Sequence, residues 1–70
     1  MPKLPARSPR QMARLLEEHG FILDRTKGSH HIYLHPESGR RVVVPMHKED
    51  LPIGTLRSIL KQAGLERDDL

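Results

Sequence analysis

The sequence predicts a small α+β domain in which a helix, a three-stranded antiparallel sheet and a second helix follow one another. Two segments, residues 9–19 and 53–63, carry apolar side chains at helical spacing. Between them, residues 21–44 alternate with the period of strands and contain short interruptions rich in glycine and proline. The simplest packing places both helices on one face of the sheet and leaves the other face in solvent.

The first helix is predicted to begin just after Ser8. The Ser8 hydroxyl can cap the helix, a proline occupies the first helical position, and Gln11 stands three residues after the cap. Gly20 suits the left-handed conformation that ends many helices, and Phe21 can then fold back onto Leu16.

Three short strands are predicted for residues 21–26, 30–35 and 40–44. The turn at residues 27–29 contains glycine, and the turn at residues 36–39 has proline early and glycine late. Strands joined by turns this short pair with their neighbours as an antiparallel meander.

The alternation in the second strand predicts which of its side chains face the helices. Ile32 and Leu34 share one face, which is expected to be the buried one. His31, Tyr33 and His35 share the other face and are expected to lie in solvent.

The second helix is predicted to begin at Pro52 or Ile53, with an apolar stripe formed by Leu56, Ile59, Leu60 and Ala63. Gly64 followed by Leu65 repeats the helix ending predicted for the first helix. The whole chain, residues 1–70, is predicted to form one domain, with residues 1–7 as a loose leader and residues 66–70 as a frayed acidic tail.

The composition excludes several classes of protein. The chain has 70 residues and no cysteine, which excludes a disulfide framework and a thiolate metal cluster. No apolar run approaches the ~18 residues that a membrane span needs. No apolar stretch follows the basic N-terminal residues as it would in a secretory signal. We therefore expect a compact, basic, cytoplasmic domain.

Positive charge is concentrated in one part of the chain. The formal net charge is +3, and residues 25–48 hold five Lys or Arg against one acidic residue, with four of the five histidines. Such a concentration favours a polyanionic partner, of which nucleic acid is the commonest. A solvated basic face with no partner is the alternative that composition leaves open.

His30 is the strongest candidate for chemistry because it follows a Gly-Ser turn, where a ligand can approach the backbone closely. It shares a face with Ile32, so its ring is expected to be partly desolvated beside Lys27 and Arg25. Both effects favour the neutral imidazole, which can act as a base. The alternative is a structural histidine at the margin of the core.

The remaining histidines have simpler explanations. His19 suits the C-terminal end of a helix, and His35 precedes a proline in a turn. His31 and His35 would lie roughly 13 Å apart along a strand, too far for one metal ion. Ser29 and His30 are neighbours in a strand and point to opposite faces, which argues against a Ser–His hydrolase. We expect neither a metal nor a cofactor.

Metal-free cleavage of RNA fits the groups that are present. RNA supplies its own nucleophile, the 2′-hydroxyl. The protein therefore needs a base, an acid for the leaving oxygen, and cations for the charge on the phosphorane. One histidine surrounded by lysine and arginine meets most of these needs without a deep pocket.

Four blocks of the sequence resemble the HicA toxin family. They are KGSHHIY at residues 27–33, HP at 35–36, VP at 44–45 followed by His47, and GTLRSILKQAGL at 54–65. The Gly-Ser-His turn and the Gly-Thr-Leu-Arg helix are specific in combination, and the similarity extends over nearly the whole chain.

The resemblance implies a fold like the double-stranded RNA-binding domain and an mRNA-cleaving toxin held inactive by a HicB antitoxin. The family's catalytic histidine follows Gly-Ser, which implies His30 here. The residues expected to contact RNA are Arg25, Lys27, Gly28, Ser29, Arg41 and Lys48. The proton donor for the leaving oxygen stays open between His47 and solvent.

Two other functions remain possible from the sequence. A non-catalytic RNA-binding module would bind duplex RNA with a strong salt dependence and would not need His30. A protein-interaction domain would use the basic segment to hold an acidic partner and would leave RNA intact.

Overall fold

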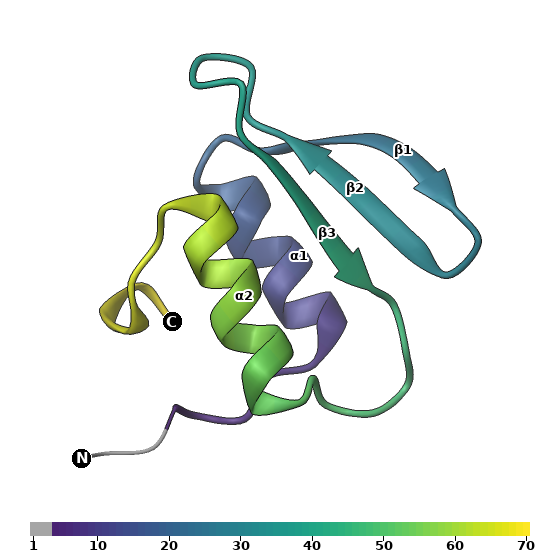
Figure 1. Ribbon diagram of the computed structural model, residues 1–70, viewed down its shortest axis with the longest axis vertical. Helices are drawn as coiled ribbons and strands as arrows, with labels where there is room; N and C mark the ends of the chain where they lie inside the picture. Colours follow the sequence, from purple (N-terminus) through teal and green to yellow (C-terminus); the bar gives the residue numbers. More distant parts are fainter. Residues whose placement is uncertain (1–3) are drawn as a thin grey trace.

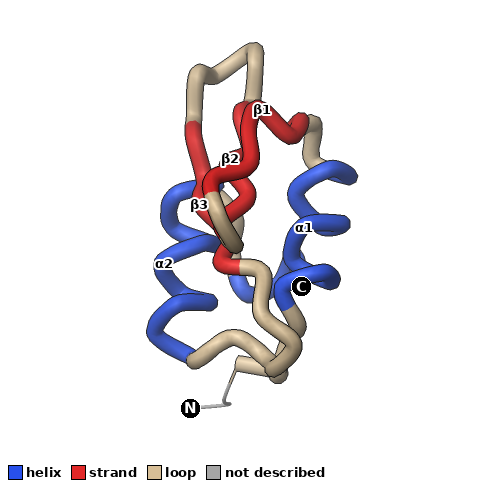
Figure 2. Tube along the Cα trace, turned by 90° about the vertical axis from the view of Figure 1, so that its right-hand side faces the viewer, coloured by secondary structure: helices blue, strands red, loops and turns tan. Residues whose placement is uncertain are grey.

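The computed structural model describes residues 4–70 and confirms the predicted order of helix, three strands and helix (Figure 1). The elements are α1 (Pro9–Glu18), β1 (Ile22–Lys27), β2 (His30–Leu34), β3 (Arg41–Pro45), α2 (Ile53–Ala63) and the 3-10 turn η1 (Arg67–Asp69). The sheet is antiparallel with strand order β1-β2-β3. Both helices lie on one of its faces, and Figure 2 shows the strands in front of them.

Helix α1 begins and ends as the sequence predicts. The Ser8 hydroxyl accepts a hydrogen bond from the Gln11 N–H at 3.1 Å, and the Gln11 side chain accepts one from the Ser8 N–H at 2.8 Å. At the other end Gly20 has a φ of +89°, and the Phe21 N–H donates to the Leu16 carbonyl at 2.9 Å. This ending directs the chain from α1 into β1.

Helix α2 ends in the same way. The Leu65 N–H donates to the Leu60 carbonyl at 2.9 Å, and Gly64 has a φ of +71°. A Cβ at Gly64 would lie 3.0 Å from the guanidinium carbon of Arg40, a contact that a small shift of this exposed side chain would relieve. Arg40 in turn donates to the carbonyl of Gln62 at the end of the helix.

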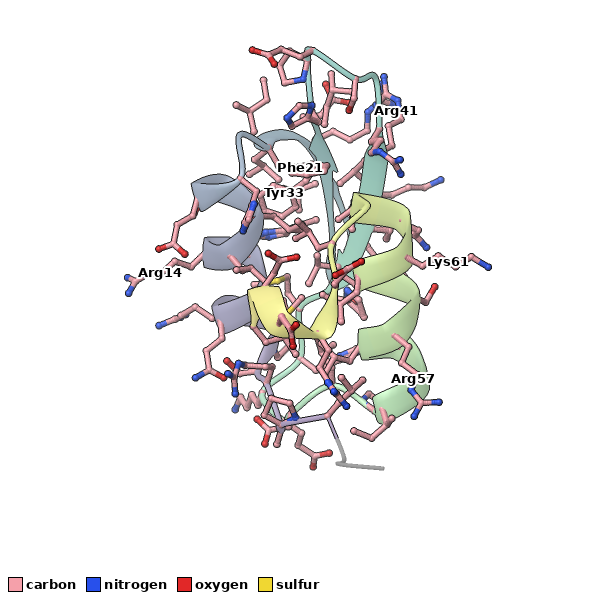
Figure 3. All side chains as sticks on the ribbon, turned by 90° about the vertical axis from the view of Figure 1, so that its left-hand side faces the viewer. Arg14, Phe21, Tyr33, Arg41, Arg57 and Lys61 are labelled. Atoms are coloured by element: carbon pink, nitrogen blue, oxygen red, sulfur yellow. The ribbon has the colours of Figure 1, made fainter. Side chains whose placement is uncertain are left out.

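The prediction of which face of β2 is buried is wrong. Tyr33 is only 4% exposed and lies opposite Val42, which is fully buried. Ile32 lies opposite Val43, which is 41% exposed on the face turned away from the helices. Figure 3 shows Tyr33 between α1 and the sheet, next to Phe21.

Strand β3 explains this reversal. Residues 42–44 are all valine, and turning the first and third inward buries two of them, whereas the opposite orientation would bury one. Cross-strand neighbours share a face, so Tyr33, opposite Val42, and His31, opposite Val44, also turn toward the helices. The alternation in β2 alone does not decide the matter, because both of its faces carry residues with large apolar parts.

A β-bulge interrupts the pairing of β1 with β2. Leu23 lies opposite Tyr33 and Arg25 lies opposite Ile32, so Asp24 is an extra residue in β1. In a regular strand, residues share a face only when they are an even number of positions apart. The extra residue shifts this pattern by one, so Ile22 faces away from the helices together with Arg25 and Lys27.

The core lies between the helices and the sheet. It consists of Met12, Ala13, Leu16, Phe21, Tyr33, Val42, Val44, Leu51, Leu56, Ile59, Leu60 and Ala63. All four residues of the stripe predicted for α2 are among them. Among the described residues, no helix is long and apolar enough to cross a membrane.

The two ends of the described chain both contact this core. The predicted leader spans residues 1–7, of which residues 1–3 lie outside the described part. Leu4 packs against the core, and the Arg7 carbonyl accepts a hydrogen bond from the Leu51 N–H at 2.9 Å. The acidic tail forms the 3-10 turn, after which Leu70 is partly buried against the core.

Candidate functional site

His30 is the first residue of β2 and lies on the open face of the sheet. Its neighbours across the strands are Lys27 in β1 and Pro45 in β3. The side chain is exposed, so the partial burial predicted from the sequence is wrong. The error follows from the reversed orientation of β2: the face that carries His30, Ile32 and Leu34 is the solvent face. A ligand can therefore reach His30 without entering a pocket.

The turn before His30 is fixed by the backbone conformation of Gly28 and by one hydrogen bond from the segment after β3. Gly28 has a φ of +59° and occupies the first central position of a two-residue hairpin turn, where a type II′ turn requires glycine. No atom lies within 4 Å of a Cβ built on Gly28, so glycine is needed for the backbone conformation and not for space. The Ser29 carbonyl accepts a hydrogen bond from the Met46 N–H at 2.7 Å. The start of β2 is thereby tied to the segment after β3.

His47 and Lys48 leave the sheet at the same end as His30, because they follow Pro45, its cross-strand neighbour. Both line a shallow hollow of about 440 Å³ against the N-terminus of α1, where Ser8 and Arg10 also lie. The structure thus brings a predicted RNA contact, Lys48, and His47, one of the two candidates for the proton donor, to this end of the sheet.

The other two predicted cations lie further along the open face. Arg25 is opposite Ile32, and Arg41 is opposite Leu34, four residues from His30 and roughly 13 Å away at the rise of a strand. One carboxylate joins them: Asp24 Oδ2 is 2.8 Å from Arg41 Nη1 and 3.5 Å from Arg25 Nε. Lys27 is the predicted cation directly beside His30.

Asp24 is expected to make the fold sensitive to acid. The hydrogen bond from Arg41, with the charges of Arg41 and Arg25, holds the pKa of Asp24 below its ordinary value of 3.8. Because the pKa is lower in the folded chain, the carboxylate stabilises the fold above about pH 3.8 and loses this contribution as the pH falls through the lowered pKa. Asp24→Asn should therefore lower the Tm at neutral pH and change it little in strong acid. Thermal unfolding of both proteins across this range checks it, and a Tm difference independent of pH would contradict it.

The remaining histidines lie away from the open face. The His31 side chain faces the helices beside Tyr33, and its buried Nδ1 has no hydrogen-bond partner among the described residues. In the turn after β2, His35 Nδ1 accepts a hydrogen bond from the Ser38 N–H at 3.1 Å, which is the structural role predicted for it. His19 is the C-terminal cap of α1, as predicted.

Within residues 4–70, no three side chains of the metal-binding types lie close enough together to hold an ion. A hollow of about 650 Å³ is on the helix side between α2 and the C-terminal turn. Arg57 and Lys61 of α2 line it and project outward in Figure 3. None of the predicted site residues contributes to this hollow.

Asp24 is the site residue that the sequence does not reveal. Its contacts depend on the bulge, and no turn residue or break in polarity marks the bulge in the sequence of β1. Only the pairing of three strands shows that this carboxylate can reach an arginine on each edge strand.

Comparison with known proteins gives a family assignment. No curated protein sequence matches the chain. A family model described as the HicA toxin of bacterial toxin-antitoxin matches residues 9–65. The matched part includes both helices, the whole sheet and the open face that carries His30.

Proposed function

The chain belongs to the HicA toxin family of bacterial toxin–antitoxin systems, and we propose that it is a metal-independent endoribonuclease that cleaves mRNA in the cytoplasm. His30 is its catalytic residue in this proposal. The RNA contacts are Arg25, Lys27, Gly28, Ser29, Arg41 and Lys48.

The observation that carries this proposal is the exposed His30 on the open face, directly across from Lys27. An open face with an imidazole at one end and cations along it suits a long polyanion. A small metabolite would need a concave site around the reactive group. In RNA the scissile phosphate can lie over His30 while neighbouring phosphates extend toward Arg25 and Arg41.

The reaction needs only groups that the site, the RNA and the solvent contain. His30 accepts the proton of the 2′-hydroxyl, and the 2′-oxygen attacks the adjacent phosphorus. The bond from phosphorus to the 5′-oxygen breaks, and that oxygen takes a proton from solvent or from His47. Lys27 stabilises the additional negative charge of the phosphorane. The products are a 2′,3′-cyclic phosphate and a 5′-hydroxyl.

The partner implied by the family is a HicB-type antitoxin. Besides its cations, the open face carries Ile22 and Val43, which are 53% and 41% exposed. An acidic antitoxin surface with apolar side chains at its centre would cover these residues and His30 together. Inhibition in this proposal is the exclusion of RNA from the open face.

We expect the purified protein to cleave single-stranded RNA in the presence of EDTA and to leave 5′-hydroxyl and 2′,3′-cyclic phosphate ends. End-labelling and mass spectrometry of the products check this. A DNA oligonucleotide of the same sequence is the control, and it should stay intact because it lacks the 2′-hydroxyl. Cleavage of the DNA, or a requirement for a divalent ion, would rule out the mechanism. RNA that is bound but uncut would favour a non-catalytic RNA-binding module.

A further inference from the structure

The Asp24 carboxylate holds two arginines that come from the two edge strands of the sheet. A single oxygen, Oδ2, contacts both Arg41 Nη1 and Arg25 Nε. Arg25 is in β1 and Arg41 is in β3, so the Arg41 side chain reaches across β2 on the open face to the carboxylate of β1. The carboxylate therefore offsets part of the positive charge of these two arginines.

Both guanidinium groups keep donors available for a second anion. Each has five N–H donors, and each uses one nitrogen toward Asp24. The side chains of Arg25 and Arg41 are 68% and 55% exposed, whereas that of Asp24 is 27% exposed. A phosphate can thus approach the arginines from solvent, but it must do so beside a fixed negative charge. Lys27, across from His30, has no such acidic partner within residues 4–70.

We propose that Asp24 is a built-in competitor for RNA phosphate, which weakens RNA binding at the Arg25–Arg41 end of the sheet and leaves Lys27 and His30 to dominate binding. The inference rests on the proposed function, because it assumes that RNA lies along the open face. Asp24 acts through the arginines and takes no part in the chemical step. It limits how tightly the protein holds RNA that does not engage the His30 end.

The test measures the binding of single-stranded RNA with every 2′-hydroxyl methylated, so that no cleavage occurs. Asp24→Asn should tighten binding about two- to five-fold at low salt, the range that exposed charge pairs contribute. It should also steepen the dependence of log K on log salt by roughly 0.7, the increment for one further phosphate contact with a single strand. Fluorescence anisotropy over a series of salt concentrations gives both quantities.

Glu37→Gln is the matched control. It changes the net charge by the same amount and lies in the turn next to Arg41, but Glu37 is exposed and forms no ion pair within residues 4–70. We expect it to leave the salt slope unchanged. In a background of Arg25→Ala and Arg41→Ala, Asp24→Asn should lose its effect on the slope, because no arginine remains to be released. Thermal unfolding shows that each variant is folded at the temperature of the assay.

Two outcomes would overturn the inference. Equal effects of Asp24→Asn and Glu37→Gln would show that only net charge matters. Weaker binding by Asp24→Asn would show that the carboxylate positions the arginines for RNA and does not compete with it. Failure of the proposed function has a different signature, because the unmodified protein would then leave ordinary RNA uncut, whatever Asp24→Asn does to the binding of methylated RNA.

Discussion

Replacing His30 with alanine is expected to slow RNA cleavage by about 10²- to 10⁴-fold, the contribution typical of a general base or acid. The fold should be unaffected, because the side chain is exposed and covers no part of the core. Expression of His30→Ala in bacteria should no longer arrest growth. Cleavage rates of the purified variant, with circular dichroism to confirm its structure, check this expectation.

The adjacent histidine provides the matched control. His31 faces the helices and has a buried Nδ1 with no partner among the described residues. An unpaired buried polar atom costs about 1–3 kcal/mol, so His31→Leu should be at least as stable as the unmodified protein. It should also keep its cleavage activity, because position 31 does not reach the open face.

The two substitutions together decide the assignment. If His30→Ala stays fully toxic, His30 is not catalytic. If only His31→Leu abolishes cleavage in a folded protein, the reactive histidine lies on the helix side of the sheet, and the proposed path of the RNA over the open face is wrong.

Tyr33→Ala is expected to destabilise the domain by about 3 kcal/mol or more, the usual cost of removing a buried aromatic side chain. Domains have roughly 0.05–0.15 kcal/mol of stability per residue, so a chain of 70 residues has little to spare. Ile32→Ala, one position away on the open face, should cost about 1 kcal/mol or less. Chemical denaturation of the two variants measures both values.

A larger loss of stability in Ile32→Ala than in Tyr33→Ala would contradict this expectation. It would indicate that β2 buries Ile32 and Leu34, as the alternation within the strand suggests. Tyr33→Phe is the control, because it keeps the ring in the core and removes only the hydroxyl. Burial, with a smaller effect of Glu17, raises the pKa of Tyr33, so this hydroxyl is neutral at physiological pH. A loss of stability in Tyr33→Phe as large as in Tyr33→Ala would show that the hydroxyl, and not the ring, is what matters.

The elements that are determined locally could be predicted from the sequence. The capping box of Ser8 and Gln11, and the helix endings at Gly20 and Gly64, depend on residues close together in the chain. The burial of Tyr33 could not be predicted in the same way. It depends on β3, whose valines decide which face of its neighbour turns inward.

In the candidate site, too, the features that depend on nearby residues could be predicted, and those that depend on strand pairing could not. The turn before His30, with Lys27 across from it, follows from the short hairpin and was predictable from the sequence. The exposure of His30 was predicted wrongly because it depends on the orientation of β2. The contact of Asp24 with Arg41 joins residues 17 positions apart through a bulge, and nothing in the local sequence indicates it.

The bulge also determines where β1 can change its length. The pairs before it, such as Leu23 with Tyr33, and those after it, such as Arg25 with Ile32, would form one regular ladder if Asp24 were absent. Deleting this residue would therefore turn no other side chain to the opposite face, whereas a deletion elsewhere in the strand would turn over the residues on one side of it. A β1 strand that is one residue shorter and lacks Asp24 would still present Arg25 and Lys27 to solvent.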